Sequence, residues 1–300
     1  MRDKKVLIVG TGALGTLFAA RLSAVGAKVT MLGTWETGLA ALNADGAHIE
    51  GLGSFPVFAT ADPTECRDAE SVLVLVKSWQ TAHVAGQLTD CLAPGGLALT
   101  LQNGLGNDAV LASALGAHRV SQGITTLGAT LTAPGHVRMA GEAPIWLQAF
   151  LQDGLLVEML RQAGFPIEIV DNIQARVWGK LVINAAINPL TALLRVKNGV
   201  LLESASTLEL MGDLAYEAAA VAFAHGVILP FQDPKCAAEE VACSTSENLS
   251  SMLRDVLRGS PTEVDAINGA IVRIGDEEEV PVPSNRVVWS LLKDYPFVVR

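Results

Sequence analysis

The order of apolar and polar positions gives the first part of the chain a repeating character. Residues 6–9 (VLIV) form a wholly apolar run that ends at glycines. Residues 13–25 follow with helical spacing and close at Gly26, and residues 28–32 form a second apolar run. A strand that is buried on both faces reads as a continuous apolar run, so this segment predicts a β-α-β unit with parallel strands.

The same alternation continues, and then stops near residue 170. Apolar runs at 71–76 and 96–101 predict two further buried strands, which indicates a doubly wound parallel sheet. Beyond Asp171 few strand signals remain. Helical spacing predominates there, over residues 173–194, 207–225, 249–257, 263–274 and 285–294. We therefore predict an α/β fold with a Rossmann-type domain over residues 1–170 and an all-helical domain over residues 171–300.

Composition and charge narrow the class of protein. Half of the residues are hydrophobic and 17% are charged, which is enough apolar material for two cores in a chain of 300 residues. The net charge is −10 and the sequence has no run rich in Lys and Arg. Nucleic-acid-binding domains usually carry a basic patch, so we expect no nucleic-acid partner.

The cysteines and the N-terminus bear on the cellular compartment. Cys66, Cys91, Cys236 and Cys243 form no C-x-x-C pair and have no nearby His at zinc spacing, so we expect free thiols and no metal site. The N-terminal apolar run is too short for a signal peptide, and we expect no stretch of about 20 apolar residues that would span a membrane. These features predict a cytoplasmic protein without a membrane partner. The chain fits a monomer and a homodimer alike.

A glycine motif lies between the first predicted strand and the first predicted helix. The pattern G-x-G-x-x-G is specific for dinucleotides only in this strand–turn–helix context, which the chain provides. The first glycine permits the tight turn, the second lets the backbone approach a pyrophosphate, and the third lets the helix pack on the strand. The helix N-terminus then offers N–H groups to the phosphates. The predicted cofactor-binding residues of this turn are Gly10, Thr11, Gly12, Ala13, Leu14 and Gly15.

The end of the second strand bears on the choice of cofactor. Sites that prefer NAD usually have an acidic residue there for the ribose hydroxyl, but this chain reads Leu32-Gly33-Thr34-Trp35. The missing acid favours NADPH, and the absence of an arginine means that NADH is not excluded. Thr34 offers a hydrogen bond to the cofactor, and Trp35 offers a ring that can stack on adenine.

Two polar residues follow predicted strands. Lys77 comes after the strand at 71–76, and Asn103 comes after the strand at 96–101. Open α/β sheets bind ligands at the carboxyl ends of their strands, so both are candidates for contact with the cofactor. The alternative is a surface lysine and a turn-forming Asn-Gly pair.

Within the predicted helix at 173–194, residues 177–190 are nearly all apolar except for one polar stripe. Lys180, Asn184 and Asn188 are spaced at i, i+4 and i+8, which places them within about 80° of arc on one face. Buried polar groups need partners, so the stripe either faces a ligand or belongs to a hydrogen-bond network between helices. Pro189 is expected to disturb the helix near Asn188.

Such a lysine suits hydride transfer to a ketone. The carbonyl oxygen becomes negative as the hydride arrives, and a donor must stabilise that charge and deliver a proton. Burial lowers the pKa of a lysine and makes it a better general acid. The asparagine amides are suited to holding a carboxylate or a hydroxyl.

Two segments downstream add candidates for the same site. Thr245 or Ser246 is expected to cap the helix predicted at 249–257, with Asn248 and Ser251 on one face of it. Glu263 opens the next predicted helix. It is expected to accept a hydrogen bond from Lys180 or from a ribose, or simply to complement the helix dipole as an acid in the first turn.

The chain as a whole resembles the ketopantoate reductase (2-dehydropantoate 2-reductase) family. The resemblance covers the full length, and its motifs are GTGALG, LVLVKSWQ, LQNGLGN, WGKLVINAAINPLTALL, SENLSSMLRD and TEVDAINGAIV. It implies a Rossmann domain followed by a helical domain, with the active site in the cleft between them. It also implies NADPH-dependent reduction of ketopantoate to pantoate, a step toward pantothenate and coenzyme A. Relatives often have an arginine where this chain has Thr34.

The resemblance also implies roles for single residues. Lys180 would be the proton donor, Lys77 would lie near the nicotinamide ribose, and Glu263 would contact the cofactor ribose and the lysine. Asn103 would lie between cofactor and substrate, and the backbone near Gly128 would touch the nicotinamide. The residues that would hold the substrate are Asn184, Asn188, Asn198 and Ser251, to which the pattern of the chain adds Asn248.

Two alternatives to this function stay open. One is the reduction of a related 2-keto acid or imine on the same scaffold, with the same lysine. The other is a dinucleotide-sensing protein without turnover, in which cofactor binding would not depend on Lys180.

Overall fold

The computed structural model describes residues 5–151 and 154–294. It divides into two compact units. The sheet unit contains residues 1–102 and 107–173, and the helical unit contains residues 103–106 and 174–300. The short segment Asn103–Gly106 therefore belongs with the helices, although the residues on both sides of it belong to the sheet unit.

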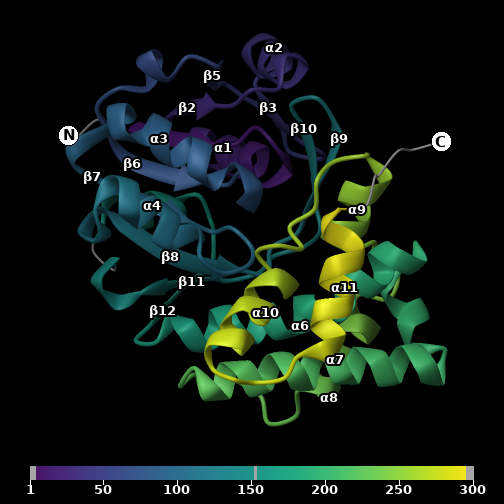
Figure 1. The fold of residues 1–300 in the computed structure, drawn as a ribbon. Helices are drawn as coiled ribbons and strands as arrows, with labels where there is room; N and C mark the ends of the chain where they lie inside the picture. The colour runs from purple at the N-terminus through teal and green to yellow at the C-terminus, as the bar shows by residue number, and fades with distance from the viewer. Residues whose placement is uncertain (1–4, 152–153, 295–300) are drawn as a thin grey trace. The chain divides into compact units, whose positions relative to one another are not determined.

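The sheet unit is built on an eight-stranded sheet with the order β12-β11-β8-β7-β6-β1-β2-β5 (Figure 1). All neighbours pair parallel except β8 and β11, which are antiparallel. The strands are β1 (Lys5–Val9), β2 (Lys28–Leu32), β5 (Phe58–Thr60), β6 (Ala69–Val74), β7 (Leu92–Thr100), β8 (Val120–Thr125), β11 (Ile145–Gln148) and β12 (Ile167–Val170).

Helices cover both faces of this sheet, as a doubly wound fold requires. Side chains alternate along β1, so Val6 and Ile8 enter one core, while Leu7 and Val9 enter the other. The helices are α1 (Ala13–Ala24), α2 (Glu36–Asp45), α3 (Thr81–Cys91), α4 (Asn107–Leu115) and α5 (Leu155–Gln162), with short 3-10 turns η1 (Pro63–Cys66), η2 (Ser78–Gln80), η3 (Ala117–Arg119) and η4 (Ala149–Leu151). The continuous apolar runs of the sequence thus correspond to strands buried on both faces.

A second, four-stranded sheet was not predicted from the sequence. Its order is β4-β3-β10-β9, with β3 (Ala47–Ile49), β4 (Gly53–Phe55), β9 (Ala129–Ala133) and β10 (His136–Met139). It packs against α1 within the sheet unit. Strands of three to five residues are too short to leave a clear alternation in the sequence.

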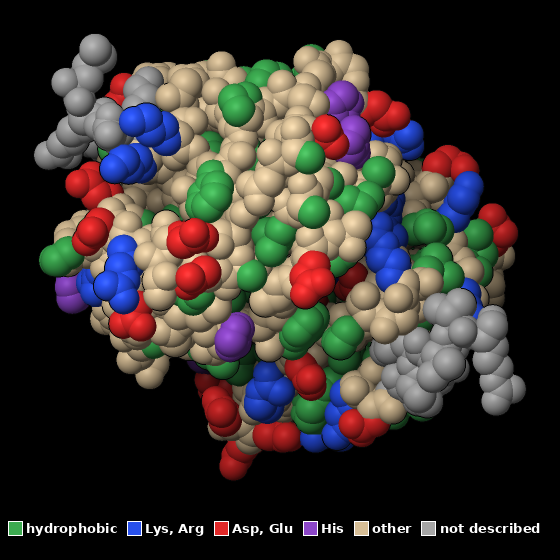
Figure 2. Space-filling view, turned by 90° about the horizontal axis from the view of Figure 1, so that it is seen from above, with side chains coloured by type: hydrophobic (Ala, Val, Ile, Leu, Met, Phe, Trp, Pro, Cys, Tyr) green, Lys and Arg blue, Asp and Glu red, His purple; other side chains and the backbone are tan. Residues whose placement is uncertain are grey.

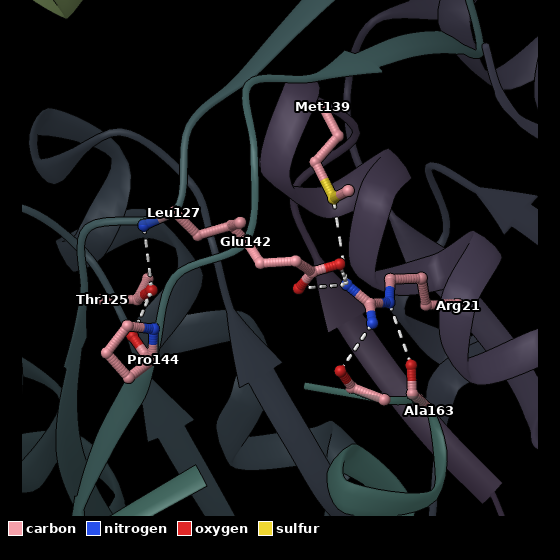
Figure 3. A network of polar contacts seen from close by, with 8 residues as sticks. Arg21, Thr125, Leu127, Met139, Glu142, Pro144 and Ala163 are labelled. Carbon is pink, nitrogen blue, oxygen red and sulfur yellow. Dashed lines mark hydrogen bonds and ion pairs between the residues drawn. The ribbon is translucent and has the colours of Figure 1, made fainter. Parts of the chain in front are cut away.

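Arg21, in the last turn of α1, fastens this part of the sheet unit (Figure 3). Its Nε donates to the carbonyl of Ala163 at 2.9 Å, and its Nη2 donates to the carbonyl of Gly164 at 2.7 Å. Nη1 pairs with Glu142 at 3.2 Å, and the guanidinium lies 4.2 Å from the ring centre of Phe165. The end of α1 is therefore tied to two distant segments of its own unit.

The helical unit has one core, formed largely by α6 and α7. Trp178, Val182 and Ala186 of α6 pack there with Met211 and Leu214 of α7. The helices are α6 (Ile173–Leu194), α7 (Ala205–Ala224), α8 (Pro234–Ser244), α9 (Ser251–Leu257), α10 (Asn268–Glu277) and α11 (Pro283–Lys293), with the 3-10 turn η5 (Asn198–Leu202). The prediction of helical segments after residue 171 is confirmed, and α6 has the predicted bounds.

The expectation that no segment has the length and composition to cross a membrane was wrong. Among the described residues, α6 is long and apolar enough, with 22 residues and an apolar window of 18 residues. However, 72% of that window is buried inside the protein. A core helix surrounded by other helices has the same apolar character, so α6 is weak evidence for a membrane span.

Two predicted helix starts lie elsewhere in the structure. The helix expected from residue 249 begins at Ser251, and the side chain of Ser250 caps it by accepting from the N–H of Leu253 at 3.0 Å. The helix expected from Glu263 begins at Asn268. Residues 263–267 form a turn instead, in which the carbonyl of Glu263 accepts from the N–H groups of Ala266 and Ile267.

The structure shows the distribution of charges on one face and the state of the cysteines. On the face shown in Figure 2, Lys and Arg side chains stand in small separate groups among acidic ones. The four cysteines are free, as predicted, with Cys66 and Cys91 buried and Cys236 and Cys243 exposed.

Candidate active site

The glycine turn between β1 and α1 has the packing that its motif predicts. Gly10 has φ +123°, and a Cβ on it would lie 2.9 Å from the carbonyl carbon of Leu75. A Cβ on Gly15 would overlap the carbonyl oxygen of Gly10. Around Gly12, by contrast, no heavy atom of the described residues lies within 4 Å of where a Cβ would be. Neighbouring atoms therefore leave no room for a side chain at Gly10 and Gly15, whereas there is free space beside Gly12.

The N-terminus of α1 fits a phosphate group. Gly12 is its N-cap residue and has no side chain to cap the helix. The first hydrogen bond of the helix runs from the N–H of Thr16 to the carbonyl of Gly12 at 2.9 Å, so the N–H groups of residues 13–15 precede it. Such N–H groups and the positive end of the helix dipole attract anions. That a dinucleotide binds here stays a prediction.

The end of β2 lies beside the glycine turn. A Cβ on Gly33 would lie 2.7 Å from the side chain of Thr11, and the N–H of Gly33 donates to Thr60 at 3.0 Å. Thr34 is exposed at this point. The ring of Trp35 packs on Gly38 of α2 and remains 39% exposed. Thr34 is thus placed at the surface next to the predicted pyrophosphate site.

Gln102, which sequence reasoning missed, joins the ends of β6 and β7. Its Nε2 donates to the carbonyl of Val76 at 3.0 Å and to Oγ1 of Thr81 at 2.8 Å, and its Oε1 accepts from Thr100 at 2.9 Å. β6 ends at Val74, two residues earlier than predicted, and Lys77 is the N-cap residue of the 3-10 turn η2. Gln102 therefore fixes the backbone directly before Lys77. A buried glutamine following an apolar strand is the signal that would have identified it.

The segment around Gly128 is held at both ends. The carbonyl of Gly128 accepts from the N–H of Ala140 at 2.9 Å. Oγ1 of Thr125 donates to the carbonyl of Pro144 at 2.9 Å and accepts from the N–H of Leu127 at 3.0 Å (Figure 3). This backbone is well fixed, and its contact with a nicotinamide stays a prediction.

All predicted catalytic and substrate-binding residues lie in the helical unit. They are Asn103, Lys180, Asn184, Asn188, Asn198, Asn248, Ser251 and Glu263. Asn103 belongs to this unit because its segment docks on the turn before α10. The N–H of Leu105 donates to the carbonyl of Ala266 at 2.9 Å, and Gly104, with φ +82°, lies so close to Ala266 that a Cβ would overlap it.

Lys180, Glu263 and Asn103 form the charged centre of this set. Nδ2 of Asn103 donates to Oε2 of Glu263 at 3.1 Å, and Glu263 is only 4% exposed. Burial lowers the pKa of Lys180 to about 8, and the nearby carboxylate of Glu263 partly opposes this effect. Lys180 is half-buried, and an amine with a pKa lowered to about 8 next to a carboxylate is suited to proton transfer.

The two asparagines of the α6 stripe continue from Lys180. Asn184 is half-buried and Asn188 is 6% exposed. α6 remains helical through Pro189 as far as Leu194, so the i, i+4, i+8 spacing is preserved and the three side chains share one face.

Asn198 lies in a more enclosed place than its sequence context suggested. It is buried, and its Nδ2 donates to Oγ1 of Thr245 at 2.8 Å. Its backbone N–H donates to the carbonyl of Asn248 at 3.0 Å. Within the described residues, Oδ1 of Asn198 is buried without a hydrogen-bond partner. This oxygen is enclosed by protein atoms, so the structure does not expose it to a ligand.

Asn248 and Ser251 differ from the prediction. Asn248 precedes α9, so the two do not share a helix face, and both are exposed. The proposed caps were also wrong, because Thr245 ends α8 and Ser250 caps α9. The Asn198–Asn248 backbone bond nonetheless brings this loop to η5.

Comparison with known proteins identifies the family. The sequence profile described as "Ketopantoate reductase PanE/ApbA" matches residues 6–152, and the profile described as "Ketopantoate reductase PanE/ApbA C terminal" matches residues 172–296. The chain belongs to the ketopantoate reductase family. It is 37% identical to the 2-dehydropantoate 2-reductase of Archaeoglobus fulgidus over 302 aligned positions, which cover 98% of each chain.

Solved structures agree with this assignment. The PanE/ApbA family ketopantoate reductase from Ralstonia eutropha JMP134 superposes with a TM-score of 0.88 at 32% identity, covering 96% of this chain and 97% of that one. D-mandelate dehydrogenase, in a ternary structure with NADH and anilino(oxo)acetate, superposes with a TM-score of 0.87 at 23% identity, covering 96% of each chain. At that identity the likeness concerns the fold alone.

Proposed function

We propose that this protein is an NADPH-dependent 2-dehydropantoate 2-reductase, which reduces the keto group of ketopantoate to the hydroxyl of pantoate. The observation that carries the proposal is the half-buried Lys180, with its pKa lowered to about 8, beside the buried Glu263 on a chain of this family. The resemblance places this step on the route to pantothenate and coenzyme A.

Lys180 is the proton donor in this proposal. A bound nicotinamide cofactor supplies the hydride. The ammonium of Lys180 stabilises the negative charge that develops on the carbonyl oxygen and then protonates it. Glu263 keeps a larger fraction of Lys180 protonated, because its carboxylate raises the pKa against the effect of burial. Asn103 holds Glu263 through the 3.1 Å hydrogen bond.

The neighbouring amides and hydroxyls hold the substrate. Asn184 and Asn188 share the face of Lys180, and their amides can bind a carboxylate without adding a competing charge. The family resemblance also assigns Asn198 to the substrate, and its amide is buried and donates to Oγ1 of Thr245. Ser251, at the start of α9, and Asn248, just before it, are exposed and offer further polar groups to the substrate.

The sheet unit holds the cofactor in this proposal. The turn at Gly12 and the N-terminus of α1 would bind the pyrophosphate, and Lys77 and the backbone near Gly128, which belong to the same unit, would contact the nicotinamide end. The division into a dinucleotide domain over residues 1–170 and a catalytic domain over residues 171–300 is part of the proposal, as is a cytoplasmic location. Thr34 offers a single hydroxyl to the 2′-phosphate, so we expect NADPH to be preferred and NADH to be used as well.

The decisive experiment follows the oxidation of NADPH by absorbance, with ketopantoate as substrate and other 2-keto acids and NADH as comparators. We expect ketopantoate to be the best substrate. Turnover of another 2-keto acid while ketopantoate is inert would overturn the proposed substrate. Cofactor binding without any turnover would favour the dinucleotide-sensing alternative.

Replacing the proposed proton donor tests the mechanism directly. Lys180→Ala is expected to lower kcat by roughly 10²–10⁴, the usual contribution of a general acid. Lys293→Ala, on the exposed face of α11, serves as the matched control and is expected to leave kcat unchanged. A Lys180→Ala variant that folds and retains full activity would exclude Lys180 as the proton donor.

A further inference from the structure

Pro189 leaves a gap in the backbone hydrogen bonds of α6. Proline has no N–H, so the carbonyl of Ala185, four residues earlier, lacks its usual helical donor. Ala185 is completely buried, so bulk water cannot donate a hydrogen bond to its carbonyl. The side chain of Asn268 takes that place, because its Nδ2 donates to the carbonyl oxygen of Ala185 at 3.1 Å.

The orientation of the Asn268 amide is fixed by its other neighbours. Nδ2 of Asn285 donates to the carbonyl of Leu214 at 3.1 Å and to Oε2 of Glu217 at 2.9 Å, which leaves Oδ1 of Asn285 as an acceptor. Nδ2 of Asn268 donates to that oxygen at 3.0 Å. Both hydrogens of the Asn268 amide are thus used, one on each acceptor.

The sequence retains this asparagine at a cost. Oδ1 of Asn268 is buried and has no hydrogen-bond partner among the described residues. An apolar side chain would avoid that unsatisfied oxygen, but it would leave the carbonyl of Ala185 without a donor. The donor function toward α6 therefore accounts for an amide in this buried place.

The gap lies within the part of α6 that carries the candidate substrate residues. Ala185 directly follows Asn184, and Pro189 directly follows Asn188. Asn268 is the first residue of α10 and follows the turn of residues 263–267, where the N–H of Ile267 donates to the carbonyl of Glu263 at 3.1 Å. One side chain therefore connects the backbone of the helix that bears Lys180 to the turn that bears Glu263.

We propose that Asn268 is a positioning residue for catalysis, which replaces the hydrogen-bond donor missing at Pro189 and holds α6 in register with the Glu263 turn. This rests on the proposed function of Lys180 and Glu263. Asn268 acts through the backbone of α6, and it sets the separation between the lysine and the carboxylate as well as the place of Asn184 and Asn188. Small displacements of such groups lower rates strongly.

A double-mutant cycle isolates this role. Pro189→Ala restores an N–H that can donate to the carbonyl of Ala185, which makes the amide of Asn268 unnecessary there. We would measure kcat, KM and the pH dependence of NADPH-linked ketopantoate reduction, together with Tm, for the wild type, N268A, P189A and N268A/P189A. In the Pro189 background, N268A is expected to lower kcat about 10- to 100-fold, because the reacting groups are misplaced.

Rescue by the second substitution is the result that supports the proposal. With Ala at position 189, adding N268A is expected to change kcat by less than about threefold, because the backbone supplies its own donor. The alkaline limb of the pH profile is expected to move in N268A and to return in the double variant, since Lys180 and Glu263 regain their separation. Equal losses of kcat in both backgrounds would overturn the proposal, and so would an N268A variant with normal kcat.

The cycle remains decisive if N268A does not fold. Folding and activity of N268A/P189A would then support the proposal, and failure of the double variant to fold would overturn it, because Asn268 would be needed regardless of Pro189. If the wild type does not reduce ketopantoate, the proposed function fails by itself. The four Tm values still measure the coupling between Asn268 and Pro189 in that case. If the effects of the two substitutions on Tm were additive, Asn268 would not replace the donor missing at Pro189.

Discussion

At the scale of single residues, two opposing effects set the pKa of Lys180, and this pKa determines the pH range in which the proposed general acid is protonated. Burial favours the neutral amine, and the carboxylate of Glu263 favours the ammonium, with a pKa of about 8 as the result. A general acid must be protonated to act. We therefore expect kcat for ketone reduction to be constant at neutral pH and to fall as the pH rises through about 8, which a pH–rate profile measures.

Glu263→Gln tests the cause of that pKa. Removing the carboxylate takes away the influence that raises the pKa of Lys180, so the alkaline limb is expected to move to lower pH. The amide can still accept a hydrogen bond from Asn103, which keeps the packing close to the original. If the alkaline limb of the pH–rate profile stays in place or moves to higher pH, the carboxylate of Glu263 does not raise the pKa of Lys180.

The position of Lys180 was predictable from the sequence, whereas two buried amides that fix the backbone near candidate site residues were not. A single charge within the apolar residues 177–190 is visible in one window of sequence, and so is the i, i+4 spacing to Asn184. Gln102 and Asn268 take their meaning from partners 26 and 83 residues away, the carbonyls of Val76 and Ala185. Their hydrogen bonds depend on tertiary packing, which the local pattern does not contain.

At the scale of elements, the turn into α1 offers a matched pair of glycines. Gly15→Ala places a Cβ against the carbonyl of Gly10, which overpacks the junction and is expected to cost about 1–3 kcal/mol of stability. Gly12→Ala meets open space and is expected to leave Tm of the cofactor-free protein unchanged.

The same substitution at Gly12 is expected to weaken cofactor binding about tenfold, equivalent to about 1.4 kcal/mol, because the methyl group occupies the place of a phosphate. Thermal unfolding and titration with NADPH separate the two effects. Normal NADPH affinity in Gly12→Ala would mean that the pyrophosphate does not bind at this turn.

The start of α9 provides a second pair. Ser250 is buried, caps the helix and accepts from Oγ1 of Thr191 at 2.7 Å, so Ser250→Ala is expected to cost about 1 kcal/mol of stability. Ser251 is exposed, and Ser251→Ala is expected to raise KM for ketopantoate while Tm stays constant. Tm and KM measured on both variants test this; a KM effect of Ser250→Ala alone would move the substrate contact to the buried serine.

The predictable elements are those with a long, unambiguous pattern. α6 has 22 residues with a polar stripe, and its first and last residues are those predicted from the sequence pattern. α10 was misplaced because Glu263 resembles a first-turn acid, while in the structure its carbonyl closes a turn and its carboxylate faces Asn103 and Lys180. The conflict between local preference and observed structure falls at a predicted catalytic residue, where such conflicts are expected.

At the scale of the whole molecule, the chain passes between its two units three times. It does so at residues 102–103, 106–107 and 173–174. The segment Asn103–Gly106 lends a residue to the catalytic set of the helical unit while its flanks stay in the sheet unit. This arrangement makes Asn103 the point at which the covalent chain connects the two predicted functions, cofactor binding and proton transfer.

Gly104→Ala is expected to separate those functions. Gly104 has φ +82° and is packed against Ala266, so a Cβ is expected to push the segment off the Glu263 turn and to displace Asn103. The residues proposed to bind the pyrophosphate belong to the sheet unit and keep their sequence in this variant. We therefore expect kcat to fall at least about tenfold, since Asn103 no longer holds Glu263, and NADPH affinity to fall by a smaller factor, since only the predicted contact of Asn103 with the cofactor is lost.

Gly106→Ala distinguishes the displaced contact from backbone strain. Gly106 has a similar φ of +86°, but no heavy atom of the described residues lies within 4 Å of the place of its Cβ. It therefore carries the conformational cost of an alanine at positive φ without the collision at Ala266. If both variants lose kcat equally, strain in the crossing segment is the cause. If Gly104→Ala alone loses kcat, by a larger factor than it loses NADPH affinity, the docking of Asn103 on the helical unit is what catalysis requires.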